Sequence, residues 1–256
     1  MNTKTMNGIV FAIGLSLLLA TQASIADTSG SDDEWQFTLS PMFLWGMSMK
    51  GDSQIGPVDV PLNLDFIDDV FSNLHAVFTV HFEARKRDWT LFTEVQYVDL
   101  EPTTKISGTP VTVDVTFKNT MVELGAARRV AQFEKTDLEL LFGARYTKQQ
   151  NHTKALNGTT LVDVKEDWWD GFVGGRVITR ISDKWKFEGR GDIGTGGSDL
   201  VWNLAAFLDY RFKDWGSVFV GYKVMDYDYD NEDYGPDRYT YNARQQGPLA
   251  GLSLYW

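Results

Sequence analysis

The alternation of apolar and polar residues constrains the fold of this chain more than any other feature of its sequence. Between residues 200 and 212 every second residue is apolar or aromatic, as in Trp202, Leu204 and Leu208. Successive side chains of a β-strand point to opposite faces, so a period of two predicts a strand with one apolar face. The pattern recurs along most of the chain and predicts an all-β fold.

About ten such strands are predicted, joined alternately by short turns and longer connections. They cover approximately residues 35–47, 74–85, 89–100, a stretch that ends near 130, 137–150, 168–180, 185–193, 200–212, 217–227 and 248–256. Outer-membrane barrels have this asymmetry of connections and an even number of strands. The connection 194–199 is short where a long one is expected, so about 8 or about 12 strands are the alternatives.

The longer connections are predicted as loops. They cover residues 50–73, the stretch from Pro102 to Pro110, residues 151–167 and residues 228–238. In the first of them, residues 65–71 have helical spacing and are expected to fold over the barrel mouth. An extracellular binding or adhesion role, carried by loops 50–73 and 228–238, is the alternative to a function of the barrel itself.

Composition favours a barrel in a membrane over a soluble one. The chain contains 9 Trp, 10 Tyr and 16 Phe, yet its mean hydropathy is -0.25. In a transmembrane barrel only alternate residues are apolar, and aromatic residues gather at the two interfaces, so both values are expected together. A soluble sandwich or barrel needs polar outer faces. The predicted fold is therefore an antiparallel up-and-down transmembrane β-barrel.

The first residues have the pattern of a cleavable secretory signal. Lys4 precedes an apolar run over residues 9–20, and Ser24 and Ala26 are the small residues of a cleavage site. This run is shorter than the roughly 20 apolar residues that cross a bilayer. Export to the outer membrane of a Gram-negative bacterium is the expected result. The predicted regions are a signal peptide at 1–26, a short periplasmic tail at 27–34 and the barrel at 35–256.

The segment 248–256 resembles the assembly signal of Gram-negative outer-membrane barrels. Leu252, Leu254 and Trp256 share one face, and Tyr255 lies on the other. In such barrels the insertion machinery reads the last strand, which then pairs with the first. The resemblance implies the barrel-assembly machinery as a partner. Deletion of Tyr255 and Trp256 is expected to spare export but block insertion, because an open sheet edge is not tolerated in lipid.

Motifs along nearly the whole predicted mature chain form a second resemblance. They are Pro41, Leu44 and Trp45; Phe82 to Lys86; Gly143 to Tyr146; Asp170 with Gly174 and Arg176; Gly191 to Gly194; Gly197 to Asp199 with Trp202; and Gly221 to Lys223. Together they resemble a widespread, largely uncharacterised family of Gram-negative outer-membrane β-barrel proteins, OmpA- or OmpW-like in general architecture. The family usually has Arg where this chain has Lys223. The resemblance implies fold and location, and it supplies no catalytic residue.

Charged residues occupy the faces opposite the apolar ones and are predicted to form a lumen charge network. They are Glu83, Arg85, Glu94, Glu123, Arg129, Glu139, Arg145, Asp170, Arg176, Arg180, Lys186, Glu188, Arg190, Asp192, Asp209, Arg211 and Lys223. Because unpaired buried charge is costly, a salt-bridged core that fills the bore is expected. Glu188 is expected to lie between Arg176 and Arg180. A narrow polar path for small solutes is the alternative.

The charge of the chain limits its partners. The formal net charge is -11, and it becomes -12 once the signal peptide with its single Lys is removed. Binding of nucleic acid needs a basic surface, so no nucleic acid partner is expected. The expected partners are outer-membrane lipid and lipopolysaccharide, and the protein is expected to be a monomer. Cysteine is absent, so no disulfide and no thiol for a lipid anchor exist, and no cofactor is expected.

Catalytic and metal-binding patterns are weak. His75 and His81 are six residues apart on one strand, roughly 20 Å, which is too far for a shared metal. His81 with Glu83 could act as a base, which leaves a lipid- or peptide-hydrolysing enzyme as a third hypothesis. A solvated acidic loop is expected over a metal site, because the full spacing of a calcium loop is absent. The weak candidate metal ligands are Asp226, Asp228, Asp230 and Glu232.

Overall fold

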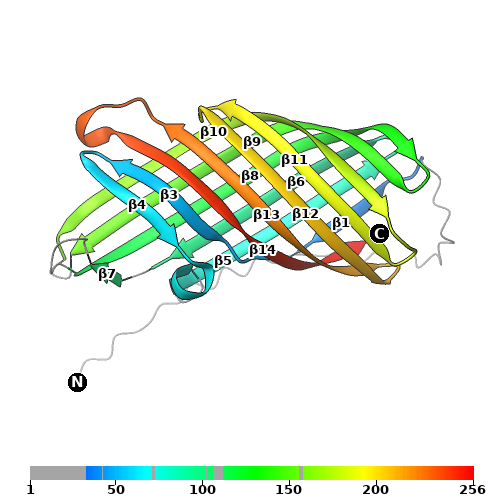
Figure 1. Cartoon of the computed structure of the whole chain (residues 1–256), viewed down its shortest axis with the longest axis horizontal. Coiled ribbons are helices and arrows are strands. Elements are labelled where there is room, and N and C mark those ends of the chain that lie inside the picture. The colour runs from blue at the N-terminus through cyan, green and yellow to red at the C-terminus, as the bar shows by residue number, and fades with distance from the viewer. Residues whose placement is uncertain (1–32, 42, 71–72, 102, 106–111, 156–157) are drawn as a thin grey trace, which may run out of the picture. The chain divides into compact units, whose positions relative to one another are not determined.

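The chain forms one closed sheet in the computed structural model. The structure describes residues 33–41, 43–70, 73–101, 103–105, 112–155 and 158–256, so the predicted signal peptide and most of the predicted tail lie outside the described residues. Within these ranges fourteen strands pair into one antiparallel sheet, which closes where β1 pairs with β14 (Figure 1). The predicted all-β antiparallel barrel is confirmed.

In the described part of the chain, nine positions of the ring are single long strands. They are β5 (Leu74–Lys86), β6 (Trp89–Leu100), β8 (Thr112–Phe133), β9 (Thr136–Ala155), β10 (Thr160–Arg180), β11 (Trp185–Gly196), β12 (Leu200–Lys213), β13 (Gly216–Asp230) and β14 (Tyr239–Tyr255). The tenth position is shared by β1 (Gln36–Ser40), β2 (Phe43–Trp45) and β3 (Ser48–Ile55), which pair in succession with β14. The short β7 (Thr103–Lys105) pairs only with β8 among the described residues. The ring therefore has the predicted ten strands.

The tenth position is broken at Pro41, which has no N–H to continue the ladder. β1 pairs with β5 on its other side, and just beyond the break the backbone N–H of Phe43 donates to Thr79 Oγ1 at 2.9 Å. β3 then turns into β4 (Val58–Leu64), so the predicted loop 50–73 is mainly a β-hairpin. Helical spacing had predicted one helical segment there, and η1 (Phe66–Val70) is a single helical turn. None of the helices among the described residues is long and apolar enough to cross a membrane.

Several strands are about twice as long as a membrane crossing requires. β8, β9 and β10 contain 22, 20 and 21 residues, whereas a transmembrane strand needs about 9–11. At about 3.3 Å per residue and a tilt of about 40°, β10 rises roughly 50 Å, against about 25 Å for the apolar band of such barrels. The predicted loop 151–167 is therefore mostly strand, and the barrel extends well beyond the width of a bilayer.

The polarity of the two strand faces inverts along β13. Val218 and Val220 lie on the outer face and are about half exposed. Further along, Asp226 and Asp228 lie on that same outer face, while Met225 is fully buried inside. An apolar outer face suits lipid and a polar one suits water. The inversion of face polarity marks the level at which the outer surface of the barrel changes from suiting lipid to suiting water.

The two ends of the barrel differ in their connections. At the turn end, on the right of Figure 1, short turns join β5 to β6, β8 to β9, β10 to β11 and β12 to β13. At the loop end, on the left, lie the tips of the β3–β4, β9–β10 and β13–β14 hairpins. The strands that reach furthest do so at the loop end. The names loop end and turn end are used below.

Aromatic rings cover the seam where the barrel closes. The backbone N–H of Phe37 donates to the carbonyl of Trp256 at 2.9 Å, and the N–H of Trp256 donates back at 3.2 Å. The ring of Trp256 stacks on Phe37 at 5.6 Å between centroids and lies 6.4 Å from Phe82. Three strands, β1, β5 and β14, thus meet under one aromatic cluster at the turn end.

Replacing Trp256 with alanine should lower the free energy of unfolding by on the order of 2 kcal/mol, because two aromatic pairs across the seam are lost. Urea titration of the refolded protein in detergent micelles measures this. Trp215→Ala is the matched control, since Trp215 is similarly exposed but packs on Phe212 of its own hairpin. Equal losses in the two variants would show that the seam has no special role.

Candidate functional site: the closed lumen

The lumen contains a belt of buried ion pairs. Arg145 contacts Glu123 at 2.7 Å and Asp192 at 2.8 Å, and all three side chains are completely buried. Arg190 contacts the same two carboxylates at 2.9 and 2.8 Å. The side chain of Asn203 donates a further hydrogen bond to Asp192. Two guanidinium groups and two carboxylates thus form a closed arrangement in which each charge has two opposite neighbours.

Other ion pairs of the belt cross the bore. Lys223 on β13 contacts Glu94 on β6 at 3.0 Å, and three ring positions separate these strands on the shorter side. Arg176 on β10 pairs with Glu83 on β5 and lies 2.6 Å from Glu139 on β9. Pairs that reach across the ring leave side chains in the centre of the lumen. The charge belt below means these residues and the group around Arg145.

His81 joins the two halves of the belt. Its Nε2 lies 3.2 Å from Glu83, and its Nδ1 lies 3.1 Å from Glu94. Ser40 is the cross-strand partner of His81, but its hydroxyl pairs with that of Ser253 at 2.9 Å. Both ring nitrogens therefore face carboxylates, and neither is free to activate a hydroxyl. The side chain of His75 lies outside the described residues.

Two aromatic rings pack against the buried guanidinium groups of the belt. Phe172 lies 5.1 Å from the guanidinium carbon of Arg145 and 5.5 Å from that of Arg190. The ring centroid of Phe92 lies 5.3 Å from the guanidinium carbon of Arg190. The ring of Phe92 sits directly over Gly125, where a Cβ would be 2.3 Å from the ring. Glycine at this position is what lets the aromatic ring reach the centre of the lumen.

Four residues predicted for the network lie elsewhere. Asp170 makes no ion pair among the described residues and instead accepts hydrogen bonds from the backbone and hydroxyl of Ser198 at 2.8 and 2.9 Å. It thereby holds the tight β11–β12 connection, which explains why 194–199 is short at the loop end. Arg180, Asp209 and Arg211 lie at the turn end. Arg180 is 60% exposed and lies 3.7 Å from Asp137.

The other predicted members are placed as follows. Arg85 contacts Glu139 at 2.7 Å, and Arg129 contacts Asp88 at 2.8 Å near the turn end. Glu188 is 3.4 Å from Arg176 and 3.7 Å from Lys186. The expected contact of Glu188 with Arg176 is therefore present, whereas Arg180 pairs with Asp137. Arg180 is at the end of its strand, where its long side chain turns to Asp137 instead.

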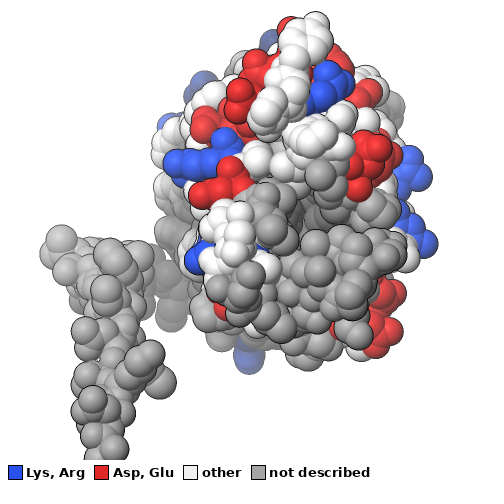
Figure 2. Space-filling model, turned by 90° about the vertical axis from the view of Figure 1, so that its left-hand side faces the viewer, with Lys and Arg blue, Asp and Glu red and all other residues white. Residues whose placement is uncertain are grey.

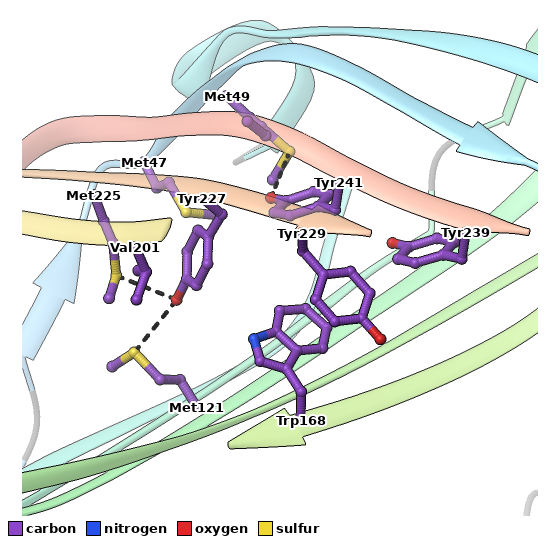
Figure 3. Close-up of a cluster of buried hydrophobic side chains, with 11 residues drawn as sticks. Met47, Met49, Met121, Trp168, Val201, Met225, Tyr227, Tyr229, Tyr239 and Tyr241 are labelled. Atoms are coloured by element: carbon purple, nitrogen blue, oxygen red, sulfur yellow. Dashed lines mark hydrogen bonds between the residues drawn. The ribbon is translucent and has the colours of Figure 1, made fainter. Parts of the chain in front are cut away.

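A second layer of buried, mostly apolar and aromatic side chains lies in the lumen on the loop-end side of the belt. Its buried members are Met47, Met49, Met121, Trp168, Val201, Met225, Tyr227, Tyr229, Tyr239, Tyr241 and Ala243 (Figure 3). Trp168 stacks on Tyr229 with 3.9 Å between ring centroids. These residues, called the plug below, come from strands on all sides of the ring. The plug is not predicted from the sequence, because the inward faces of such a barrel are expected to be polar, whereas these inward residues are apolar or aromatic.

The tyrosine hydroxyls of the plug are satisfied locally. Tyr239 donates to the side-chain oxygen of Gln149 at 2.7 Å, and Tyr241 accepts from the amide of Gln245 at 2.9 Å. The hydroxyl of Tyr227 points to the sulfur atoms of Met225 and Met121. Buried hydroxyls that have partners cost little, so the plug combines apolar packing with fixed orientation.

At its loop-end side the plug meets a partly buried carboxyl group. Glu166 accepts hydrogen bonds from the Tyr229 hydroxyl at 3.2 Å and from the Asn231 amide at 3.3 Å. Burial raises the pKa of Glu166 above its usual range, although these two hydrogen bonds act in the opposite direction. Burial and the neighbouring Glu166 also raise the pKa of Tyr229. Burial thus makes the charged form of each group less favourable than in water.

The acidic residues near the β13–β14 connection lie on strand and rim rather than in one loop. Asp226 pairs with Arg244 at 2.7 Å on the outer face, and Asp230 pairs with Arg238 at 2.7 Å. The connection itself contains η3 (Gly235–Asp237). Figure 2 shows acidic and basic side chains interspersed at this end. Among the described residues no group of three or more His, Asp or Glu is arranged to hold a metal ion.

Two cavities lie on the turn-end side of the belt. The inner one has a volume of about 130 Å³ and is lined by belt residues, including His81, Arg176 and Lys223. It is large enough for several water molecules. The outer one has a volume of about 280 Å³ and is lined by residues of the turn end. Lys186, Asp209 and Tyr255 line both cavities.

No family model matches the chain, and no curated protein matches it in sequence. Among solved structures, the outer-membrane protease OmpT of Escherichia coli is 9% identical, with a TM-score of 0.48 over 87% of this chain and 96% of that chain. Ail of Yersinia pestis, solved with the heparin analogue sucrose octasulfate, is 10% identical, with a TM-score of 0.39 over 87% and 99%. The NanC porin is 12% identical, with a TM-score of 0.34 over 86% and 99%. The likeness to these outer-membrane β-barrels concerns the fold and no residue role.

Proposed function

We propose that the protein is a closed barrel of the Gram-negative outer membrane with a structural role, and that it does not conduct solutes. The outer face of the barrel is apolar between the turn end and the point on β13 where the polarity of the strand faces inverts. This supports the location, because lipid requires such a face. Outer-membrane lipid is then the partner of this band, and lipopolysaccharide faces the charged outer surface at the loop end.

Two successive layers of buried side chains in the lumen are the observation that supports this proposal. The charge belt fills the lumen with paired side chains, several of which reach across the ring. The plug then adds a layer of aromatic and methionine side chains on the loop-end side. A conducting path needs continuous water or polar ligands along its whole length. A narrow solute pore would have to open both layers at once.

We propose no catalytic role for the lumen. His81 is the strongest candidate base in the lumen, and both of its nitrogens face carboxylates. Thr79, its near neighbour on β5, is engaged with the backbone of Phe43. A hydrolase would need a hydroxyl or water in contact with a free imidazole nitrogen.

Planar bilayer recording of the purified, refolded protein should show no steady current in the wild type. Because two layers close the bore, Tyr227→Ala alone and Lys223→Ala alone should also remain silent. The double variant should give a small, noisy current, since it removes a ring from the plug and a crossing ion pair from the belt. Single-channel recording at equal protein density measures all four.

Folding of each variant is checked by its altered migration in unheated gels. Large and stable openings of the wild-type protein would contradict the proposal and favour the narrow pore. A current in Lys223→Ala alone would show that the plug does not seal the lumen.

A further inference from the structure

The outer cavity at the turn end carries an excess of positive charge. Its lining includes five cationic and two acidic side chains, an excess of three positive charges in a protein whose net charge is -11. The charged lining residues are Lys135, Arg180, Lys184, Lys186, Arg211, Asp183 and Asp209. This cavity is called the vestibule below. Its charge is opposite in sign to that of the whole chain.

Two of these cations oppose each other directly. Arg180 on β10 and Lys186 on β11 are register partners. Like charges in that arrangement destabilise a sheet unless something neutralises them. Their carboxylate contacts are long, 3.7 Å from Arg180 to Asp137 and 3.7 Å from Lys186 to Glu188.

The charge belt shows what neutralisation by the protein itself looks like. Arg176 and Arg190 are also register partners on β10 and β11. There, however, Arg176 lies 2.6 Å from Glu139, and Arg190 lies 2.9 Å from Glu123. The same like-charge arrangement is thus closely compensated inside the lumen and only loosely compensated in the vestibule.

The backbone holds the remaining vestibule cations beside this pair. The N–H of Arg180 donates to the carbonyl of Lys135, and the N–H of Arg211 donates to the carbonyl of Lys184, both at 2.8 Å. The guanidinium of Arg211 lies 4.5 Å from the ring centroid of Tyr255, which orients it. Cations from five neighbouring strands and turns therefore converge on one cavity.

The acid shared by both cavities, Asp209, is the cross-strand partner of Lys186, but among the described residues no ion pair within 4.0 Å joins the two. Asp209 accepts hydrogen bonds from the hydroxyls of Ser217 at 2.5 Å and Tyr255 at 3.4 Å. Its carboxylate is therefore held at the wall. Arg211, two residues further along β12, has no ion pair among the described residues.

We propose that the vestibule binds a small, multiply charged oxyanion of the phosphate type, as free phosphate, pyrophosphate or a phosphate ester. Arginine forks and lysine ammonium groups are the side chains that recognise such anions. A cavity of about 280 Å³ accommodates a molecule of this size. The ligand reaches it from the periplasm, and this side of entry rests on the proposed function. Binding itself does not depend on it.

Isothermal titration of the refolded full chain in zwitterionic detergent micelles, with inorganic pyrophosphate as the probe, tests the proposal. Saturable binding is expected, and it should weaken as salt rises. Arg211→Gln and Arg180→Gln should each weaken binding by about tenfold, the loss of one charge-assisted contact. The matched control is Arg87→Gln, because Arg87 is an exposed arginine of the β5–β6 turn that does not line the cavity.

Absence of saturable binding in protein that migrates as folded barrel would overturn the proposal. So would an equal affinity in Arg211→Gln and Arg87→Gln, or displacement of pyrophosphate by chloride at equal concentration. Micelles that contain phosphatidylglycerol supply the same phosphate chemistry as a lipid headgroup. Unchanged pyrophosphate affinity in these micelles supports a soluble ligand. Weaker affinity would show that the lipid headgroup competes with pyrophosphate, and it would overturn the assignment of a soluble ligand.

Discussion

Replacing Arg145 with alanine should lower the free energy of unfolding by about 3–5 kcal/mol, because it leaves two buried carboxylates to share the single guanidinium of Arg190. Glu123 and Asp192 are fully buried, so water cannot replace the lost partner. Urea titration of the refolded barrel in micelles measures the loss.

Arg244→Ala is the matched control for Arg145→Ala. Arg244 also makes a 2.7 Å ion pair, with Asp226, but its side chain is 52% exposed on the outer face. Exposed pairs contribute at most about 1 kcal/mol. A similar loss in both variants would mean that water reaches the charge belt, and the closed-lumen proposal would then lose its basis.

Replacing Trp168 with alanine should also cost about 3–5 kcal/mol, the range for loss of a large buried aromatic side chain. The substitution removes the stack on Tyr229 and the indole hydrogen bond to Asp170. Because Asp170 holds the β11–β12 connection, local proteolysis near Ser198 should increase as well. Thermal unfolding followed by near-ultraviolet circular dichroism reports both the stability and the aromatic packing.

The chain supplies an adjacent control. Trp169 follows Trp168 on β10 but lies on the outer face and is 54% exposed. In micelles the Trp169→Ala variant keeps the plug intact and should lose about 1 kcal/mol, the value of its aromatic pair with Tyr146. If the two neighbouring tryptophans cost the same, the assignment of inner and outer faces is wrong.

The strand order of this barrel could be predicted from the sequence, but the extent of the strands could not. The predicted strand 89–100 coincides with β6, because Leu91, Val95 and Tyr97 alternate on its outer face as predicted. By contrast, β10 begins at Thr160, well before the predicted start. There the outer face is polar, with Lys165 and Asp167, and a search for apolar outer faces passes over it. Apolar outer faces therefore locate the strands only where the barrel lies in the hydrocarbon layer of the membrane.

The same limit explains what was missed inside the lumen. The inward positions of Glu123 and Arg145 could be predicted, and they are register partners on β8 and β9. Contacts such as Lys223 with Glu94 depend on which strands face each other across the ring, and one sequence carries no signal for this. The alternating tyrosines 227 and 229 do carry a signal for the plug, since they share a face with Met225.

Some charged side chains of the lumen are neutralised only when the ring closes, because their ion pairs cross the bore. Along the chain, five ring strands separate β6 from β13, so Lys223 and Glu94 are far apart in an unclosed sheet. Glu83 and Arg176 also lie on strands that are not neighbours, with three ring strands between β5 and β10. Every partly assembled sheet therefore presents unpaired charges on the face that becomes the lumen, and the formation of the β1–β14 seam brings them together in one step. We expect barrel formation to be all-or-none for this reason, with the charges acting as a penalty on every intermediate that is not yet a cylinder.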